Sequence, residues 1–78
     1  MNKQEIPLNQ LPIGKKASVT SLLSDGATRR RMQDLGLIDG TQIESLYKSP
    51  SGNPVAYLIR GAVIALRSDV SAQIMVTA

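Results

Sequence analysis

The chain contains no cysteine and no histidine, and these two absences remove much of the usual chemistry of enzymes. Without cysteine there is no disulfide, no thiolate nucleophile and no sulfur ligand for zinc or an iron–sulfur cluster. Without histidine there is no imidazole ligand and no general base of the commonest type. The six acidic residues are scattered, and their spacing is not typical of a metal site or an acid–base pair. We therefore predict a protein that is not an enzyme and holds no cofactor or metal.

Long apolar runs are also missing. Every run is far shorter than the ~18 residues that a membrane-spanning helix needs. The N-terminal stretch is interrupted by Glu5, Pro7 and Pro12, so it does not read as a signal segment. We expect a cytoplasmic protein that does not insert into the membrane. Phenylalanine and tryptophan are absent, so we expect a core built from leucine, isoleucine, valine, methionine and alanine.

The size and charge of the chain set further bounds. Its 78 residues make a single domain, 1–78, close to the lower limit for a chain that folds alone. Residues 1–7 are expected to form a loosely ordered N-terminal tail. Nine basic and six acidic residues give a net charge of +3, which allows an acidic partner without requiring one.

The alternation of apolar and polar residues predicts about five short strands, at 16–22, 41–48, 55–60, 62–67 and 73–77. Asp25 is placed to cap a short helix, and Gly36 to end it in a Schellman motif that folds Leu37 back onto Met32. Ser68 is placed to cap one helical turn before the last strand. The order predicts a mainly β fold, a small SH3-like barrel with one short helix after the first strand. An open sheet packed on the helix is the competing architecture.

Three consecutive arginines, Arg29, Arg30 and Arg31, lie in the predicted helix. At about 100° per residue, Met32 and Leu35 define its buried stripe; Arg29 and Arg31 lie on opposite flanks of that stripe, and Arg30 points to solvent. Cations near a helix N-terminus are unfavourable, which suggests that Arg29 and Arg30 serve an acidic partner. Arg31 is expected to be structural. The alternative is that the arginines form an ordinary solvated face.

The predicted hairpin at 55–67 is apolar on both faces, and so small a barrel cannot cover both faces everywhere. We expect Leu58 and Val63 to contact a partner or a second copy of the chain, since exposed apolar patches mark such surfaces. Tyr57 is a further candidate, with a place in the core as the alternative. Nucleic acid is not expected as a partner, because the charge is modest and no aromatic side chain lies near the arginines. A nucleic-acid-binding module of the Sm-like or SH3-like kind is the rival hypothesis.

The segments LPIGKKASVTSL, RRRMQDLGLIDGT, SPSGNPVAYLIRG and IALR resemble, in order and spacing, the FeoA family, ferrous-iron transport protein A. The resemblance spans roughly residues 8–76. It implies an SH3-like barrel and an accessory role in bacterial ferrous-iron uptake, through contact with FeoB, a membrane transporter whose cytosolic part is a GTPase. It implies no catalytic residue and no metal ligand. The positions that match the family pattern are Leu11, Gly14, Arg31, Leu35, Gly36, Gly40, Pro54, Gly61 and Leu66.

The same resemblance implies that the partner recruits the protein to the inner face of the membrane. A second family has a similar fold, the C-terminal SH3-like domains of iron- and manganese-dependent repressors. In those proteins the domain is attached to a DNA-binding helix-turn-helix and a metal-binding region. A repressor-type regulatory module is therefore the alternative function.

Overall fold

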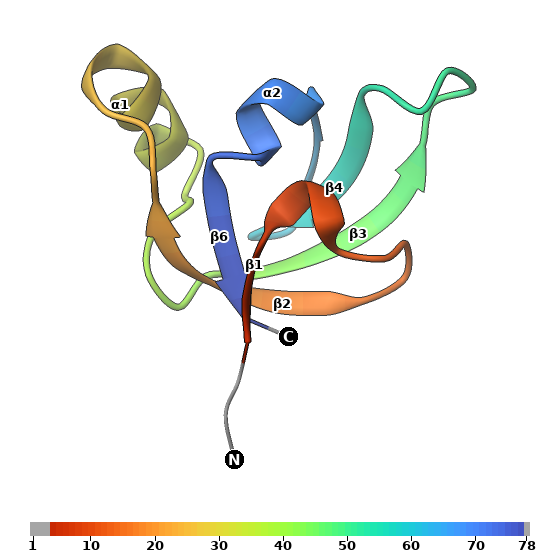
Figure 1. The fold of residues 1–78 in the computed structure, drawn as a ribbon, viewed down its shortest axis with the longest axis horizontal. Coiled ribbons are helices and arrows are strands. Elements are labelled where there is room, and N and C mark those ends of the chain that lie inside the picture. Colours follow the sequence, from red (N-terminus) through yellow and green to blue (C-terminus); the bar gives the residue numbers. More distant parts are fainter. Residues whose placement is uncertain (1–3, 78) are drawn as a thin grey trace.

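The computed structural model describes residues 4–77 and shows six antiparallel strands in one sheet, in the order β1-β6-β2-β3-β4-β5 (Figure 1). The strands are β1 (Glu5–Pro7), β2 (Lys16–Leu22), β3 (Gln42–Lys48), β4 (Val55–Ile59), β5 (Ala62–Leu66) and β6 (Ile74–Thr77). The helical elements are the 3-10 turn η1 (Leu8–Gln10), α1 (Gly26–Asp34) and α2 (Ser68–Ser71). The mainly β architecture predicted from the sequence is confirmed, with one strand more than expected.

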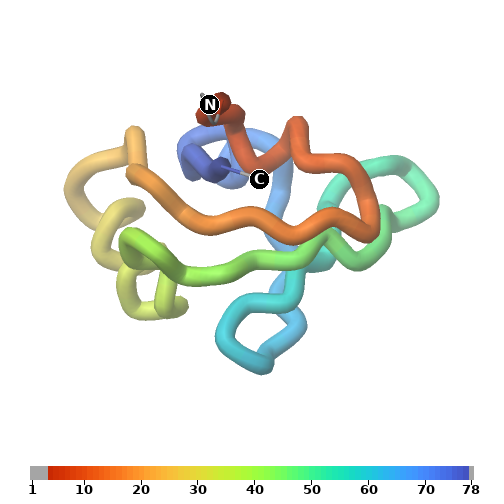
Figure 2. Tube along the Cα trace, turned by 90° about the horizontal axis from the view of Figure 1, so that it is seen from below, coloured from red at the N-terminus to blue at the C-terminus, as the bar shows by residue number. Residues whose placement is uncertain are grey.

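The sheet is strongly bent, as Figures 1 and 2 show from two directions, and its buried side chains form one core cluster. Within residues 4–77, β1 pairs only with β6 and β5 pairs only with β4. Although the sheet is strongly curved, these pairings leave it with two free edges, β1 and β5. None of the helices in this part of the chain is long and apolar enough to cross a bilayer.

The core is aliphatic, with one tyrosine in it. Its buried members come from five strands, from η1 and α1, and from the segments that directly follow these two helices: Leu8, Leu11, Ala17, Val19, Met32, Leu37, Ile43, Tyr57, Ile59, Leu66, Ile74 and Val76. Tyr57 is the largest fully buried side chain and fills the space that phenylalanine or tryptophan would otherwise take. Burial raises the pKa of its phenol, and a hydrogen bond with the Ser71 side chain offsets part of that rise.

Helix α1 ends as the sequence predicts. The amide of Leu37 donates to the carbonyl of Met32 at 3.0 Å, and the amide of Gly36 donates to that of Gln33 at 2.9 Å. Gly36 has a φ of 93°, so the two bonds form a Schellman motif with glycine in the left-handed region. The N-terminal prediction is wrong in one respect. Asp25 occupies the N-cap position, but its side chain makes no capping hydrogen bond.

The β4–β5 hairpin has the register expected from the sequence, with Ile59 opposite Ala62 and Val55 opposite Leu66. The turn at Arg60–Gly61 has φ values of 51° and 84°. Two successive residues with positive φ are typical of a type I′ turn, whose twist matches that of the strands it joins.

Two local expectations are wrong. Glu5–Pro7 is part of the sheet, with Ile6 opposite Val76, and is not a loosely ordered tail; residues 1–3 of that predicted tail lie outside the described residues. A three-residue strand that ends in proline is too short for alternation to reveal it. The second error concerns Ser68, which is the first residue of α2; Arg67 takes the N-cap position.

Candidate functional site

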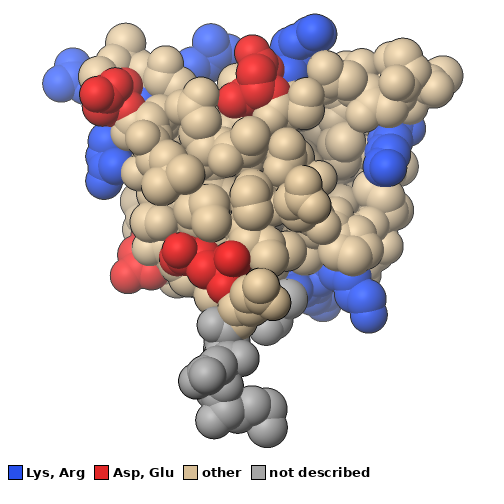
Figure 3. Space-filling view, viewed as in Figure 1, with Lys and Arg blue, Asp and Glu red and all other residues tan. Residues whose placement is uncertain are grey.

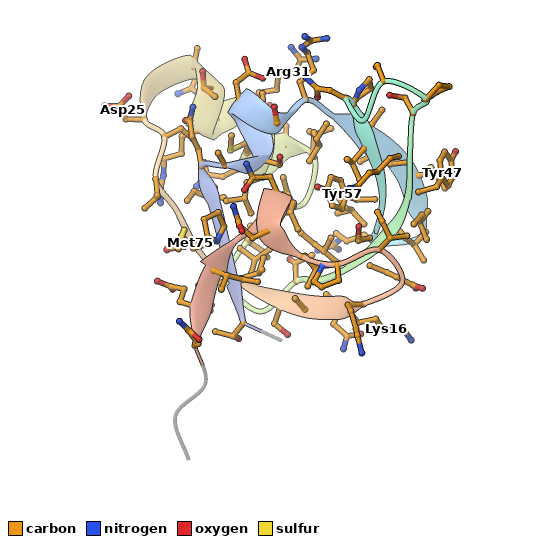
Figure 4. All side chains as sticks on the ribbon, turned by 45° about the vertical axis from the view of Figure 1, so that its right-hand side comes forward. Lys16, Asp25, Arg31, Tyr47, Tyr57 and Met75 are labelled. Carbon is orange, nitrogen blue, oxygen red and sulfur yellow. The ribbon has the colours of Figure 1, made fainter. Side chains whose placement is uncertain are left out.

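An open groove of about 460 Å³ lies between α1 and β5, and we call it the α1–β5 groove. One wall comes from α1 and the other from β5 and the start of α2. The lining residues are Thr28, Arg31, Met32, Leu35, Ile64, Ala65, Leu66, Arg67 and Val70. Apolar side chains form most of this lining, while Arg31 and Arg67 are both exposed. Figure 4 shows Arg31 near the top of the view, close to the end of the molecule where α2 lies.

The structure gives Arg29 and Arg31 of α1 different roles from those that the sequence predicted. Arg29 Nη1 donates to the carbonyl of Leu22 at 2.9 Å and so ties α1 to the end of β2. Arg31, which was expected to be structural, is exposed and lines the groove. The helical periodicity correctly put these two residues on opposite flanks of the buried stripe. It could not tell which flank meets β2 and which meets the open groove.

Arg30 lies beside a second, shallower hollow of about 480 Å³ that it shares with Arg31 and Asp34. It is exposed, so its proposed contact with a partner stays a prediction. Basic residues do not gather into one patch on the face seen in Figure 3, where blue and red atoms are spread around the periphery and the centre is uncharged. On this face, the distribution gives no support to the rival hypothesis of nucleic-acid binding.

β5 is an unpaired edge beside the groove. Its Val63 is 59% exposed and lies directly opposite the half-buried Leu58 of β4. The sequence analysis named both side chains as partner candidates, and the structure brings them together on the outer face of the hairpin. Ala65, two residues after Val63, is exposed on the same face.

Tyr57 is not available to a partner, because it is only 1% exposed. Tyr47 is the exposed tyrosine, at 59%, and Figure 4 shows it pointing away from the molecule while Tyr57 lies inside. A β-bulge between Ser45 and Tyr47 is the reason. Simple alternation would turn Tyr47 inward with Ser45, but the extra residue of the bulge turns it outward. On the neighbouring strand β4, the residue paired with Tyr47 is Ala56.

The structure offers no arrangement typical of catalysis or metal binding within its described range. No group of three or more acidic residues in 4–77 is close enough to hold a metal ion. A Ser-x-x-Lys string, the spacing of a serine nucleophile and its lysine base in some hydrolases, runs from Ser45 to Lys48 on β3. Ser45 is fully buried and its hydroxyl has no hydrogen-bond partner, while Lys48 is exposed. These two residues do not form a nucleophile–base pair.

The residues that match the family pattern have mostly structural places. Gly14, Gly36, Gly40 and Gly61 all have positive φ. Leu11 and Leu66 are buried, Leu35 packs against the core, and Pro54 directly precedes β4. Three of the nine positions, Arg31, Leu35 and Leu66, also line the α1–β5 groove.

The FeoA domain model matches residues 6–78. The chain belongs to the FeoA family. Among solved structures it is similar to a FeoA-like protein from Clostridium acetobutylicum, with 34% identity, a TM-score of 0.86, and coverage of 97% of this chain and 87% of that one. The FeoA protein of Chlorobium tepidum is 33% identical, with a TM-score of 0.85 and coverage of 92% and 69%. A comparison with curated protein sequences finds no significant match.

A third relative bears on the fold. FeoA of Stenotrophomonas maltophilia, solved in complex with zinc, is described as a prokaryotic SH3 domain protein. It is 27% identical, with a TM-score of 0.79 and coverage of 88% of this chain and 86% of that one. The SH3-like fold predicted from the sequence is therefore confirmed, and the family connects the chain with ferrous-iron transport.

Proposed function

We propose that this FeoA family member is a cytoplasmic accessory protein of ferrous-iron uptake, and that it acts by binding a FeoB-type membrane transporter or the GTPase domain of that transporter. Family membership supports the connection with iron transport. For the S. maltophilia relative, a role in activating ferrous-iron transport has been suggested. We propose no catalysis by the chain itself, since it has neither histidine nor cysteine. Recruitment to the membrane would follow from the transporter contact.

The surface made by the α1–β5 groove and the outer face of the hairpin carries this proposal. It combines an apolar lining, two exposed arginines and an apolar edge strand with Val63 at 59% exposure. Apolar surface gives a contact its affinity, and rim charges give it orientation and a fast association. A small protein with such a surface is suited to holding a partner.

The direct test measures binding of the purified chain to the transporter by biolayer interferometry. One series uses the full-length transporter in detergent and the other uses its soluble GTPase domain. We expect saturable binding in at least the first series, and binding only there would place the contact on the membrane part or on the assembled transporter. The variant Lys48→Glu, which changes an exposed charge on β3 outside the groove, serves as a control and should bind as the unmodified chain does. Binding in neither series would contradict the proposal.

A cellular test complements the binding test. Deleting the gene for this chain should lower transporter-dependent uptake of ferrous iron, and restoring the chain should recover it. Uptake that is unchanged by the deletion would contradict the accessory role.

A further inference from the structure

We propose that the free edge of β5 accepts an extended acidic segment of the partner as an additional strand, with the apolar side chains of that segment in the α1–β5 groove. The inference rests on the proposed function, because it specifies how the transporter would be held. It follows from the two edges of the sheet, from the hairpin register and from the charges beside the groove.

The two edges of the sheet differ in how they are protected. β1, at one end, has three residues and includes Glu5 and Pro7. Charges, proline and short length are the features with which natural proteins protect an edge strand from pairing with another chain. β5, at the other end, reads Ala-Val-Ile-Ala-Leu, with no charge and no proline. Only the β5 edge is left suited to pairing.

The register shows which backbone groups of β5 are open. Ile59 and Ala62 flank a two-residue turn, so they form a hydrogen-bonded pair, and the pairs then alternate along the hairpin. Val63 and Ala65 fall at the non-hydrogen-bonded positions, so their N–H and C=O groups point away from β4. Among the described residues, neither one takes part in a backbone hydrogen bond outside the sheet. An incoming strand would find two donors and two acceptors at the spacing it needs.

The groove determines the side chains of the incoming strand. Alternate residues of that strand would face inward, over Met32, Leu35 and Ile64. Arg31 stands on the α1 wall and Arg67 follows β5 directly, and neither side chain donates a hydrogen bond within residues 4–77. Guanidinium groups in such positions bind carboxylates well, often through two parallel hydrogen bonds. The segment should therefore combine apolar residues with Asp or Glu.

A second copy of the chain is a less suitable occupant. It would bring its own Arg31 and Arg67 to the same edge, so like charges would meet, and like charges at an interface suppress association. A partner with carboxylates meets no such repulsion. Charge complementarity therefore favours a different protein over self-pairing.

Amide hydrogen exchange measured by NMR tests the pairing directly. On addition of the full-length transporter in detergent, the Val63 and Ala65 amides should become protected, by about tenfold or more. Ile64 lies between them, and its amide already faces β4, so its exchange should change much less. This alternation is specific to strand addition. Protection of all three to the same degree, or of none of them, would overturn the inference.

Substitutions test the same point by affinity. Val63→Ala removes the side chain and keeps the N–H, while Val63→Pro also removes the outward donor, which an edge strand tolerates better than a central one. The proline variant should bind the transporter about tenfold more weakly than the alanine variant, because it loses a hydrogen bond and blocks the approach of the strand. Equal affinity of the two folded variants would count against strand addition.

A third test, by charge reversal, does not depend on whether the proline variant folds. Arg31→Glu combined with Arg67→Glu should weaken binding about tenfold or more at low ionic strength, with less effect at high salt. Lys48→Glu, an exposed reversal outside the groove, should leave affinity within about twofold. An equal loss in the control would mean a non-specific attraction and would overturn the inference.

The outcomes separate the inference from the function it rests on. Transporter binding with no alternating protection at Val63 and Ala65 removes the inference and leaves the proposed function in place. Absence of any transporter binding removes both. Protection that rises with the concentration of the chain alone would assign the edge to a second copy and overturn the choice of an acidic partner.

Discussion

Replacing Gly36 by alanine should destabilise the protein more than the same change at any other glycine. Gly36 has a φ of 93°, a conformation that residues with a Cβ rarely adopt. In addition, a Cβ added there would lie 2.4 Å from Cδ of Arg60, whose side chain crosses over the glycine. The Arg60 side chain thus contacts the residue that ends α1, and it connects the tip of the β4–β5 hairpin to this helix.

The magnitude follows from separating these two costs. The left-handed conformation costs alanine about 1–2 kcal/mol. That cost is shared by Gly52 and Gly61, with φ of 87° and 84°, where an added Cβ would meet nothing within 4 Å. Displacing the Arg60 side chain adds roughly 1 kcal/mol, at the low end for overpacking, because Arg60 is exposed and has room to move. We expect a loss of about 2–3 kcal/mol at Gly36 and about 1–2 kcal/mol at the other two.

Equilibrium unfolding in urea, followed by far-UV circular dichroism, measures these losses. The control is a double-mutant cycle with Arg60→Ala, which keeps the Cβ at position 60 and removes the atoms that collide. In that background the loss at Gly36 should fall to that at Gly61. The reasoning is refuted if the three glycines cost the same, or if the extra loss at Gly36 persists when Arg60 is alanine.

Three further predictions concern other residues. Arg29→Ala should lower the free energy of unfolding by about 0.5–1.5 kcal/mol, because it removes the hydrogen bond to Leu22. Arg31→Ala should change it by less than about 0.5 kcal/mol; urea unfolding that ranks the two in reverse would contradict the assignment. Ser45→Ala should raise the free energy of unfolding by about 1 kcal/mol, since it removes a buried hydroxyl without a partner. A loss of stability there would mean that the hydroxyl is satisfied in solution. Burial raises the pKa of Tyr57 above its ordinary 10.0, so the folded chain holds this proton more tightly than the unfolded chain does. Stability should therefore be unaffected by this group below pH 10 and should fall as the pH rises further, and thermal melts of Tyr57→Phe should lack this part of the alkaline loss.

Features determined by a few neighbouring residues could be predicted from the sequence. The end of α1 depends on one glycine that accepts a positive φ and on Leu37, which folds back into the core. The β4–β5 register depends on a two-residue turn at Arg60–Gly61 between two apolar runs. In both cases the deciding interaction spans only a few residues, so the local sequence contains nearly all the information.

Features determined by distant contacts could not be predicted. β1 forms because β6, about seventy residues later in the chain, offers it a free edge. The bulge in β3 reverses the orientation of Tyr47, and no residue in that strand marks it. The candidate site has the same limit. Its two walls come from α1 and β5, and only the fold brings Arg31 and Arg67 to the same groove.

The arginines of α1 show why the partner surface must be argued from position. The sequence argument treated all three as unfavourable cations near a helix start, and took a partner as the explanation for Arg29 and Arg30 and a structural role as the explanation for Arg31. α1 runs only from Gly26 to Asp34, so Arg30 lies at its middle and Arg31 in its last turn, where a cation is favourable. Helix electrostatics therefore gives no reason to invoke a partner for Arg31. The case for a partner rests on what surrounds it: an apolar groove, a second exposed arginine at Arg67, and a strand edge without the protection that β1 has.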